Sequence, residues 1–185
     1  MLSLAAKAGC LGVFVGVESV SAAALSEANK GFNKVERLKE NIARFYDRGV
    51  LVDGGIIFGF DTDTQDVFDR TIEALKKVKI DSVVVNILIP YPGTEFYRKF
   101  EREGRIICTD YSKYAGATVI VRPMNMTVEE LQAGYNRFTK DHYRMMEIVY
   151  RAFKQPNAVA TITRLIAHVG HRVSSLSGRQ GKACD

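Results

Sequence analysis

Val-Val-Val-Asn-Ile-Leu-Ile-Pro-Tyr-Pro-Gly-Thr, residues 83–94, is the stretch that decides the fold class of this 185-residue chain. Its seven mostly β-branched, apolar residues are too few for an independent helix and predict a strand buried on both faces, as in a parallel sheet. Pro90 and Pro92 lack a backbone N–H and must end the strand in a rigid turn. Because ligands bind at the carboxyl ends of parallel strands, this turn suits the wall of a pocket. It equally suits a stiff strand-to-helix loop that binds nothing.

Two earlier runs repeat the pattern of a buried strand followed by helix. Residues 12–19 predict a first strand, followed by a short helix capped by Ser21 and a longer helix over 33–48. Residues 52–60 predict a second strand, whose glycines indicate close approach of a ligand or of another backbone. Three strand–helix units in succession predict an α/β fold with a parallel sheet and right-handed crossovers.

Asp-Thr-Asp-Thr, residues 61–64, follows the second strand directly. Two carboxylates so close together can indicate a metal site. The favoured interpretation is that Thr64 is the N-cap of the next helix, with Asp66 in its first turn. Thr94 is expected to cap the helix after the third strand in the same way.

Composition and segment character divide the chain into three parts. Residues 1–104 contain the strand–helix units, residues 105–170 an extended segment and a helical extension, and residues 171–185 a basic tail predicted to be disordered. Thr127 opens the long helix of the second part with a capping box, and His142 lies on its apolar face, which favours a core histidine over a ligand.

Charge and hydropathy argue against a nucleic-acid-binding, a membrane or a secreted protein. The net charge of +5 arises within residues 140–185, where eight Lys or Arg face three acids. Arginines do not alternate with aromatic residues there, so we expect a solvated face and no nucleic-acid partner. No apolar run approaches the ~20 residues that cross a bilayer, and Lys7 interrupts the N-terminal apolar stretch. We therefore expect neither a membrane protein nor a signal peptide, but a cytoplasmic protein.

Three motifs follow one another in order: Gly16-Val17-Glu18-Ser19, Ile57-Phe58-Gly59-Phe60-Asp61, and Asn86 through Pro90-Tyr91-Pro92-Gly93-Thr94. This ordered set resembles the second half of the radical S-adenosylmethionine (SAM) enzymes, in particular the branch that often carries an N-terminal cobalamin-binding domain. The resemblance covers residues 1 to about 150. It implies a partial TIM-like (β/α)6 barrel of which this chain supplies strands four to six, followed by a helical C-terminal extension.

The resemblance also implies a SAM site at the carboxyl ends of the three strands. The first strand would end at the ribose and methionyl part, the second would border the adenosine, and the third would flank the adenine with its Pro-x-Pro-Gly turn. Carboxylates and hydroxyls suit ribose and an ammonium group, and apolar strand ends suit a flat base. The residues concerned are Glu18 and Ser19, then Ile57, Phe58 and Gly59, then Ile89, Pro90, Tyr91, Pro92 and Gly93.

The chain departs from the family at the [4Fe–4S] cluster. The family's Cys-x-x-x-Cys-x-x-Cys loop is absent, and Cys10, Cys108 and Cys184 are too far apart in sequence to replace it. Without a cluster no electron can cleave the sulfonium bond, so the polypeptide alone is expected to be inactive, and whether it is an enzyme stays open. The resemblance assigns it neither a catalytic residue nor a metal ligand.

Three hypotheses follow. Met1 falls where the family has the helix before strand four, so the first is a truncated, split or fragmentary enzyme whose partner is the missing N-terminal barrel half. The second is a non-catalytic half-barrel remnant that self-associates through an exposed strand edge. The third, a small nucleotide-binding domain built on Gly54-Gly55, is disfavoured because no G-x-G-x-x-G or P-loop spacing is present.

Overall fold

Strands and helices alternate along the chain, as the sequence predicts. The structure, a computed structural model, describes residues 1–27, 35–78, 80 and 82–142. The predicted tail and the extension beyond residue 142 lie outside these residues. The elements are α1 (Leu2–Lys7), β1 (Gly12–Glu18), α2 (Ala22–Glu27), α3 (Val35–Tyr46), β2 (Leu51–Phe58), α4 (Val67–Val78), β3 (Ser82–Ile87), α5 (Glu95–Arg102), the 3-10 helix η1 (Tyr111–Lys113) and α6 (Val128–His142).

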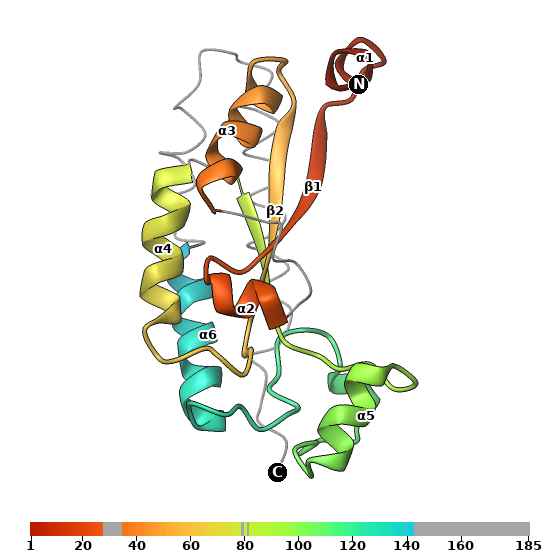
Figure 1. Cartoon of the computed structure of the whole chain (residues 1–185), viewed down its shortest axis with the longest axis vertical. Coiled ribbons are helices and arrows are strands. Elements are labelled where there is room, and N and C mark those ends of the chain that lie inside the picture. Colours follow the sequence, from red (N-terminus) through yellow and green to blue (C-terminus); the bar gives the residue numbers. More distant parts are fainter. Residues whose placement is uncertain (28–34, 79, 81, 143–185) are drawn as a thin grey trace.

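The three strands form one parallel sheet in the order β1-β2-β3. Helices α3, α4 and α6 lie on one side of this sheet (Figure 1). The predicted α/β class and parallel sheet are therefore confirmed. Whether these strands are part of a (β/α)6 barrel stays a prediction, because three strands do not define a closed barrel.

The main core lies between the sheet and these helices. Every second residue of β2, including Val52, Ile56 and Phe58, points to this side and is almost fully buried. The Phe58 ring centre lies 4.6 Å from that of Phe68 in α4 and 5.0 Å from that of Phe138 in α6. The period of two along a strand thus turns the intervening residues to the other face of the sheet.

A second core joins the strand ends to α2 and α5. Its buried residues are Ala24, Phe60, Leu88, Phe100, Cys108, Ile120 and Val121. The extended segment expected after residue 104 is found at 118–121, where it forms one antiparallel bridge, Val121 to Ile106, rather than a strand within a sheet. Just before this segment, Gly116 O accepts a 2.7 Å hydrogen bond from Ile87 N, which joins this part of the chain to the end of β3.

The helix caps test the predicted boundaries. Thr94 Oγ1 accepts a hydrogen bond from Tyr97 N at 3.1 Å, which confirms that cap. Thr127 and Glu130 form the predicted capping box. The Thr64 cap is wrong: α4 begins at Val67, and the Thr64 hydroxyl instead hydrogen bonds to the Asp66 carboxylate. Within the described residues, no helix has the length and apolar character needed to cross a membrane.

Candidate functional site

The strand register brings the predicted SAM-site segments to one edge of the sheet. Glu18 at the end of β1 pairs with Ile56, and Ile57 pairs with Asn86 of β3. Leu88 N donates a 2.8 Å hydrogen bond to Phe58 O, which extends the pairing of β2 and β3 toward the Pro90 turn. The three predicted segments therefore follow the carboxyl ends of three neighbouring parallel strands, where α/β proteins bind ligands.

Glu18 has a strained backbone. Its φ of 64° is the only positive value at a non-glycine position among the described residues, and the β1–β2 register is irregular between Gly16 and Glu18. The Glu18 carboxylate folds back over Gly16, where a Cβ atom would collide with it. Left-handed backbone costs an ordinary residue roughly 1–2 kcal/mol and is often found at functional sites.

Ser19 is buried, and its hydroxyl has a local role. Ser19 Oγ accepts a hydrogen bond from Ser21 N at 3.1 Å, which helps the chain turn into α2. A role for Ser19 in binding a ligand stays a prediction.

The residues at the end of β2 face different ways. Ile57 is half-buried against the second core, whereas the Phe58 side chain is buried among the helices. Gly59 has a φ of 103°, and a Cβ there would lie 3.0 Å from Leu131 of α6. The glycine at this position is thus explained by its backbone and by α6. Of the three residues, Ile57 has a side chain that packs against the second core rather than among α3, α4 and α6.

The Pro-Tyr-Pro-Gly segment is mainly a turn. Thr94 N donates to Tyr91 O at 3.2 Å, with Pro92 and Gly93 (φ 87°) as the central residues, the pattern of a type II turn. Pro90 is buried, and Ile89 is half-buried beside Ile57 in the second core. Tyr91, Pro92 and Gly93 are exposed. Ile57 and Ile89 thus both pack against the second core, and the tip of the turn is exposed to solvent.

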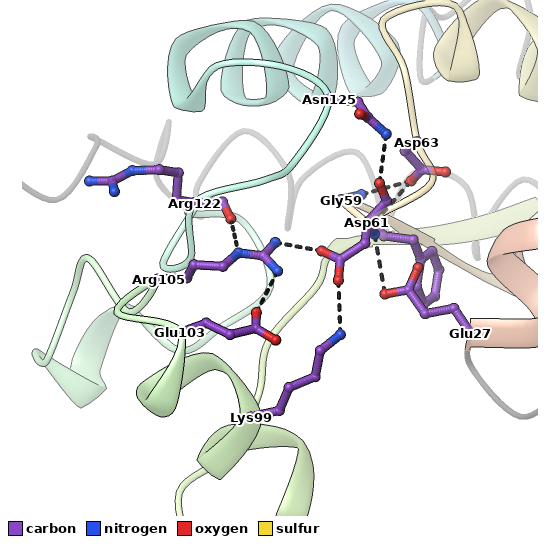
Figure 2. Close-up of polar contacts among 10 residues, drawn as sticks. Glu27, Gly59, Asp61, Asp63, Lys99, Glu103, Arg105, Arg122 and Asn125 are labelled. Atoms are coloured by element: carbon purple, nitrogen blue, oxygen red, sulfur yellow. Dashed lines mark hydrogen bonds and ion pairs between the residues drawn. The ribbon is translucent and has the colours of Figure 1, made fainter.

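Asp61 is the centre of a polar cluster beside this edge (Figure 2). Its carboxylate pairs with Lys99 Nζ at 2.9 Å and with the guanidinium of Arg105. Its carbonyl oxygen accepts a 2.7 Å hydrogen bond from Asn125, and its N–H donates to Glu27 Oε1 at 3.2 Å. Burial by itself raises the pKa of Asp61, but the hydrogen bonds from Arg105 and Lys99 lower it below the ordinary 3.8.

Asp63 contrasts with Asp61 two residues earlier. Its side chain is buried, and Oδ2 accepts hydrogen bonds from Gly59 N (3.0 Å) and Phe60 N (3.1 Å). Desolvation is the main cause that raises its pKa to about 6, although the two backbone hydrogen bonds oppose it. The role of Asp61 is not visible in the sequence, because its partners Lys99 and Arg105 are 38 and 44 residues distant. The partners of Asp63 are local, but its burial depends on tertiary packing.

The described residues do not fit an iron–sulfur cluster. Cys10 is a free thiol beside α1, whereas Cys108 lies in the second core, and no group of three metal-ligating side chains is present in the described ranges.

Comparison with known proteins identifies relatives, although no family model matches the chain. The chain is similar to the bacteriochlorophyllide d C-12(1)-methyltransferase of Chlorobaculum tepidum, with 26% identity over 83% of the chain and 33% of that protein. It is also similar to the C-8(2)-methyltransferase of the same organism, with 26% identity over 91% of the chain and 38% of that protein. A third relative is the hopanoid C-2 methylase of Rhodopseudomonas palustris, with 30% identity over 53% of the chain and 19% of that protein.

These relatives are enzymes of the radical SAM type, so the resemblance predicted from the three motifs is confirmed at low identity and partial coverage. The chain spans about a third of the length of the two bacteriochlorophyllide methyltransferases.

Proposed function

We propose that this chain forms the SAM-contacting half of a radical SAM barrel, with β1, β2 and β3 as its strands four to six. The observation that carries the proposal is the similarity to radical SAM-type methyltransferases over most of the chain. The parallel order β1-β2-β3, with Glu18 and the 57–59 and 89–93 segments at one edge, supports it.

The proposed site uses features that suit a nucleoside. Glu18 supplies a carboxylate whose strained backbone fixes its direction, and Ile57 and Ile89 offer half-buried apolar surface to the base. SAM, when bound beside a reduced cluster, supplies a radical. The cluster ligands would come from residues outside this sequence, since none of its cysteines has the required spacing. The chain by itself is therefore proposed to lack radical activity. A cobalamin domain in the complete enzyme stays an expectation from the resemblance.

The test is SAM binding with the rest of the barrel supplied. The chain is combined with the N-terminal part of the C-8(2)-methyltransferase relative, or with its own upstream coding sequence where one exists, and SAM binding is measured by equilibrium dialysis. Glu18→Ala should weaken binding at least tenfold, while the exposed α3 residue Glu40, changed to Ala, should not. Equal affinity in both variants removes Glu18 from the site, and absence of SAM binding in the assembled wild type overturns the proposal.

A second candidate function is self-association through β1. This strand is an edge of the sheet within the described residues, and Phe14, whose ring lies over Gly55, is 63% exposed. Exposed apolar edges promote pairing with another chain. Light scattering at roughly tens of micromolar, the range where such surfaces associate, should show oligomers that Phe14→Gln reduces and that Tyr111→Gln, an equally exposed aromatic in η1, leaves unchanged. A monomeric wild type would reject this function.

A further inference from the structure

Two carboxylates next to the proposed site each have a buried oxygen atom without a hydrogen bond. Within the described residues, these are Asp63 Oδ1 and Glu27 Oε2, the only such buried side-chain atoms. Asp63 is 2% exposed. Buried polar atoms of folded proteins nearly always have a partner, so an orphaned carboxylate oxygen points to a missing proton, ion or water.

The other oxygen of each carboxylate holds the backbone of the loop after β2. Asp63 Oδ2 accepts from the N–H groups of Gly59 and Phe60, and Glu27 Oε1 accepts from the N–H group of Asp61. Three consecutive backbone amides are therefore fixed by two carboxylates from different elements (Figure 2). The first of these amides, at Gly59, belongs to the segment proposed to border the adenosine, and the other two follow it directly.

The charges around Asp63 do not neutralise it fully. Glu27 on α2 repels the negative charge of Asp63, and Arg70 on α4 attracts it. Arg70 itself is exposed and pairs with Asp66 at 3.5 Å. The Asp61 carboxylate is turned away toward Lys99 and Arg105. Asp63 and Glu27 are thus two like charges beside one solvated cation, Arg70. This arrangement favours uptake of a proton by Asp63, the more deeply buried of the two carboxylates.

We propose that Asp63 is a positioning residue of the candidate site: one carboxylate oxygen fixes the backbone at Gly59 and Phe60, and protonation of the other, beside Glu27, removes a buried negative charge and so favours the closed loop. The relevance of this inference to SAM binding rests on the proposed function. The protonation of Asp63 and its effect on the loop do not depend on it. A proton on Oδ1 removes the repulsion from Glu27 and makes this oxygen a hydrogen-bond donor, while Oδ2 continues to accept from the two amides. The loop at the end of β2 is then held more firmly at mildly acidic pH.

The direction of the pH dependence follows from the linkage between proton binding and loop closure. In the closed loop the pKa of Asp63 is about 6, and in an open, solvated loop it returns to 3.8. The closed state therefore binds more protons, and its stability falls as pH rises from 3.8 through about 6. Opening should become about tenfold more frequent between pH 5 and pH 7.

The test is amide hydrogen exchange of the full chain from pH 5 to pH 7.5, expressed as protection factors for Gly59 and Phe60. Wild type should lose protection about tenfold across this range. Asp63→Asn keeps an oxygen acceptor but cannot titrate, so protection should persist without pH dependence. Asp63→Ala should lose protection at every pH. Glu27→Gln should move the midpoint to lower pH, and Asp69→Asn, an exposed control on α4 that pairs with Arg137, should leave it unchanged.

Three results would overturn the inference: pH-independent protection in wild type, unchanged pH dependence in Asp63→Asn, or protected amides in Asp63→Ala. A tenfold rise in protection on adding Mg²⁺ or K⁺ at pH 7.5 would also overturn it, because a cation would then occupy the pair in place of the proton. The measurement needs no SAM. If the assembled barrel does not bind SAM but the amide protection depends on pH as expected, only the proposed function is rejected. If SAM binds but the amide protection does not depend on pH, only the positioning role of Asp63 is rejected.

Discussion

Lys99 Nζ lies 2.9 Å from Asp61 Oδ2 and joins α5 to the loop that follows β2. The same carboxylate pairs with Arg105, whose side chain is only 8% exposed and whose guanidinium carbon lies 4.5 Å from the centre of the Phe100 ring. Arg105 also pairs with Glu103 at 2.9 Å and donates to Arg122 O at 2.8 Å. The Asp61 cluster therefore ties the second core to the edge of the sheet.

The first prediction concerns Arg105. Arg105→Ala leaves Asp61 and Glu103 without their buried partner and removes packing on Phe100, so we expect a loss of about 3 kcal/mol in the free energy of unfolding. Arg98→Ala, which breaks an exposed pair with Glu95, is the control and should cost at most about 0.5 kcal/mol. Urea unfolding measures both. Equal effects would show that the Asp61 cluster contributes no more than a surface ion pair.

The second prediction concerns acid stability. The pKa of Asp61 is lower in the folded protein than its ordinary 3.8, so the stability that its ion pairs provide is present at neutral pH and is lost as pH falls below about 4. Asp61→Asn should reduce stability at pH 7 and flatten its decline between pH 5 and pH 3. Asp66→Asn is not an adequate control here because its pKa is also lowered. Asp69→Asn, an exposed carboxylate on α4, serves instead.

The third prediction concerns the contact of α4 with α6. A Cβ atom at Gly134 in α6 would collide with the Phe68 ring, so this glycine allows the two helices to approach closely. Gly134→Ala should therefore destabilise the protein by roughly 1–3 kcal/mol, although alanine is the better helix former.

Phe68→Leu supplies the matched test of that contact. The smaller side chain leaves room for the new methyl group, so Gly134→Ala should cost less in the Phe68→Leu background than in wild type. Additive effects of the two substitutions, measured by urea unfolding as a double-mutant cycle, would contradict the proposed collision.

The sequence predicts the elements better than the contacts between them. Strand periodicity, helix amphipathicity and the Thr94 and Thr127 caps depend on neighbours a few residues apart, and the structure confirms them. The Thr64 cap is wrong because α4 begins only at Val67, and the Thr64 hydroxyl donates to the Asp66 carboxylate, a local contact that the capping pattern does not predict.

The candidate site shows the same limit. The motifs place Glu18, Ile57 and Ile89 at or just after the ends of strands. The register agrees with these positions. It does not test whether the three residues contact SAM. The pairing of Asp61 with Lys99 and Arg105 depends on how α5 folds back on the sheet, and this information is not contained in any short window of sequence. A glycine in a strand can also be required for reasons other than a ligand. Gly59 is explained by its positive φ and by its closeness to Leu131.

The last prediction separates strain from charge at Glu18. Glu18→Ala and Glu18→Gly both remove the carboxylate, but only glycine relieves the left-handed φ of 64°. We expect the glycine variant to be about 1 kcal/mol more stable than the alanine variant. The same two substitutions at Glu40, an exposed position within α3, should give the opposite order, because glycine is the weaker helix former there by about 1 kcal/mol. If alanine were also the more stable residue at position 18, the left-handed conformation would not be present in solution, and a strained carboxylate at the end of β1 could not direct a ligand.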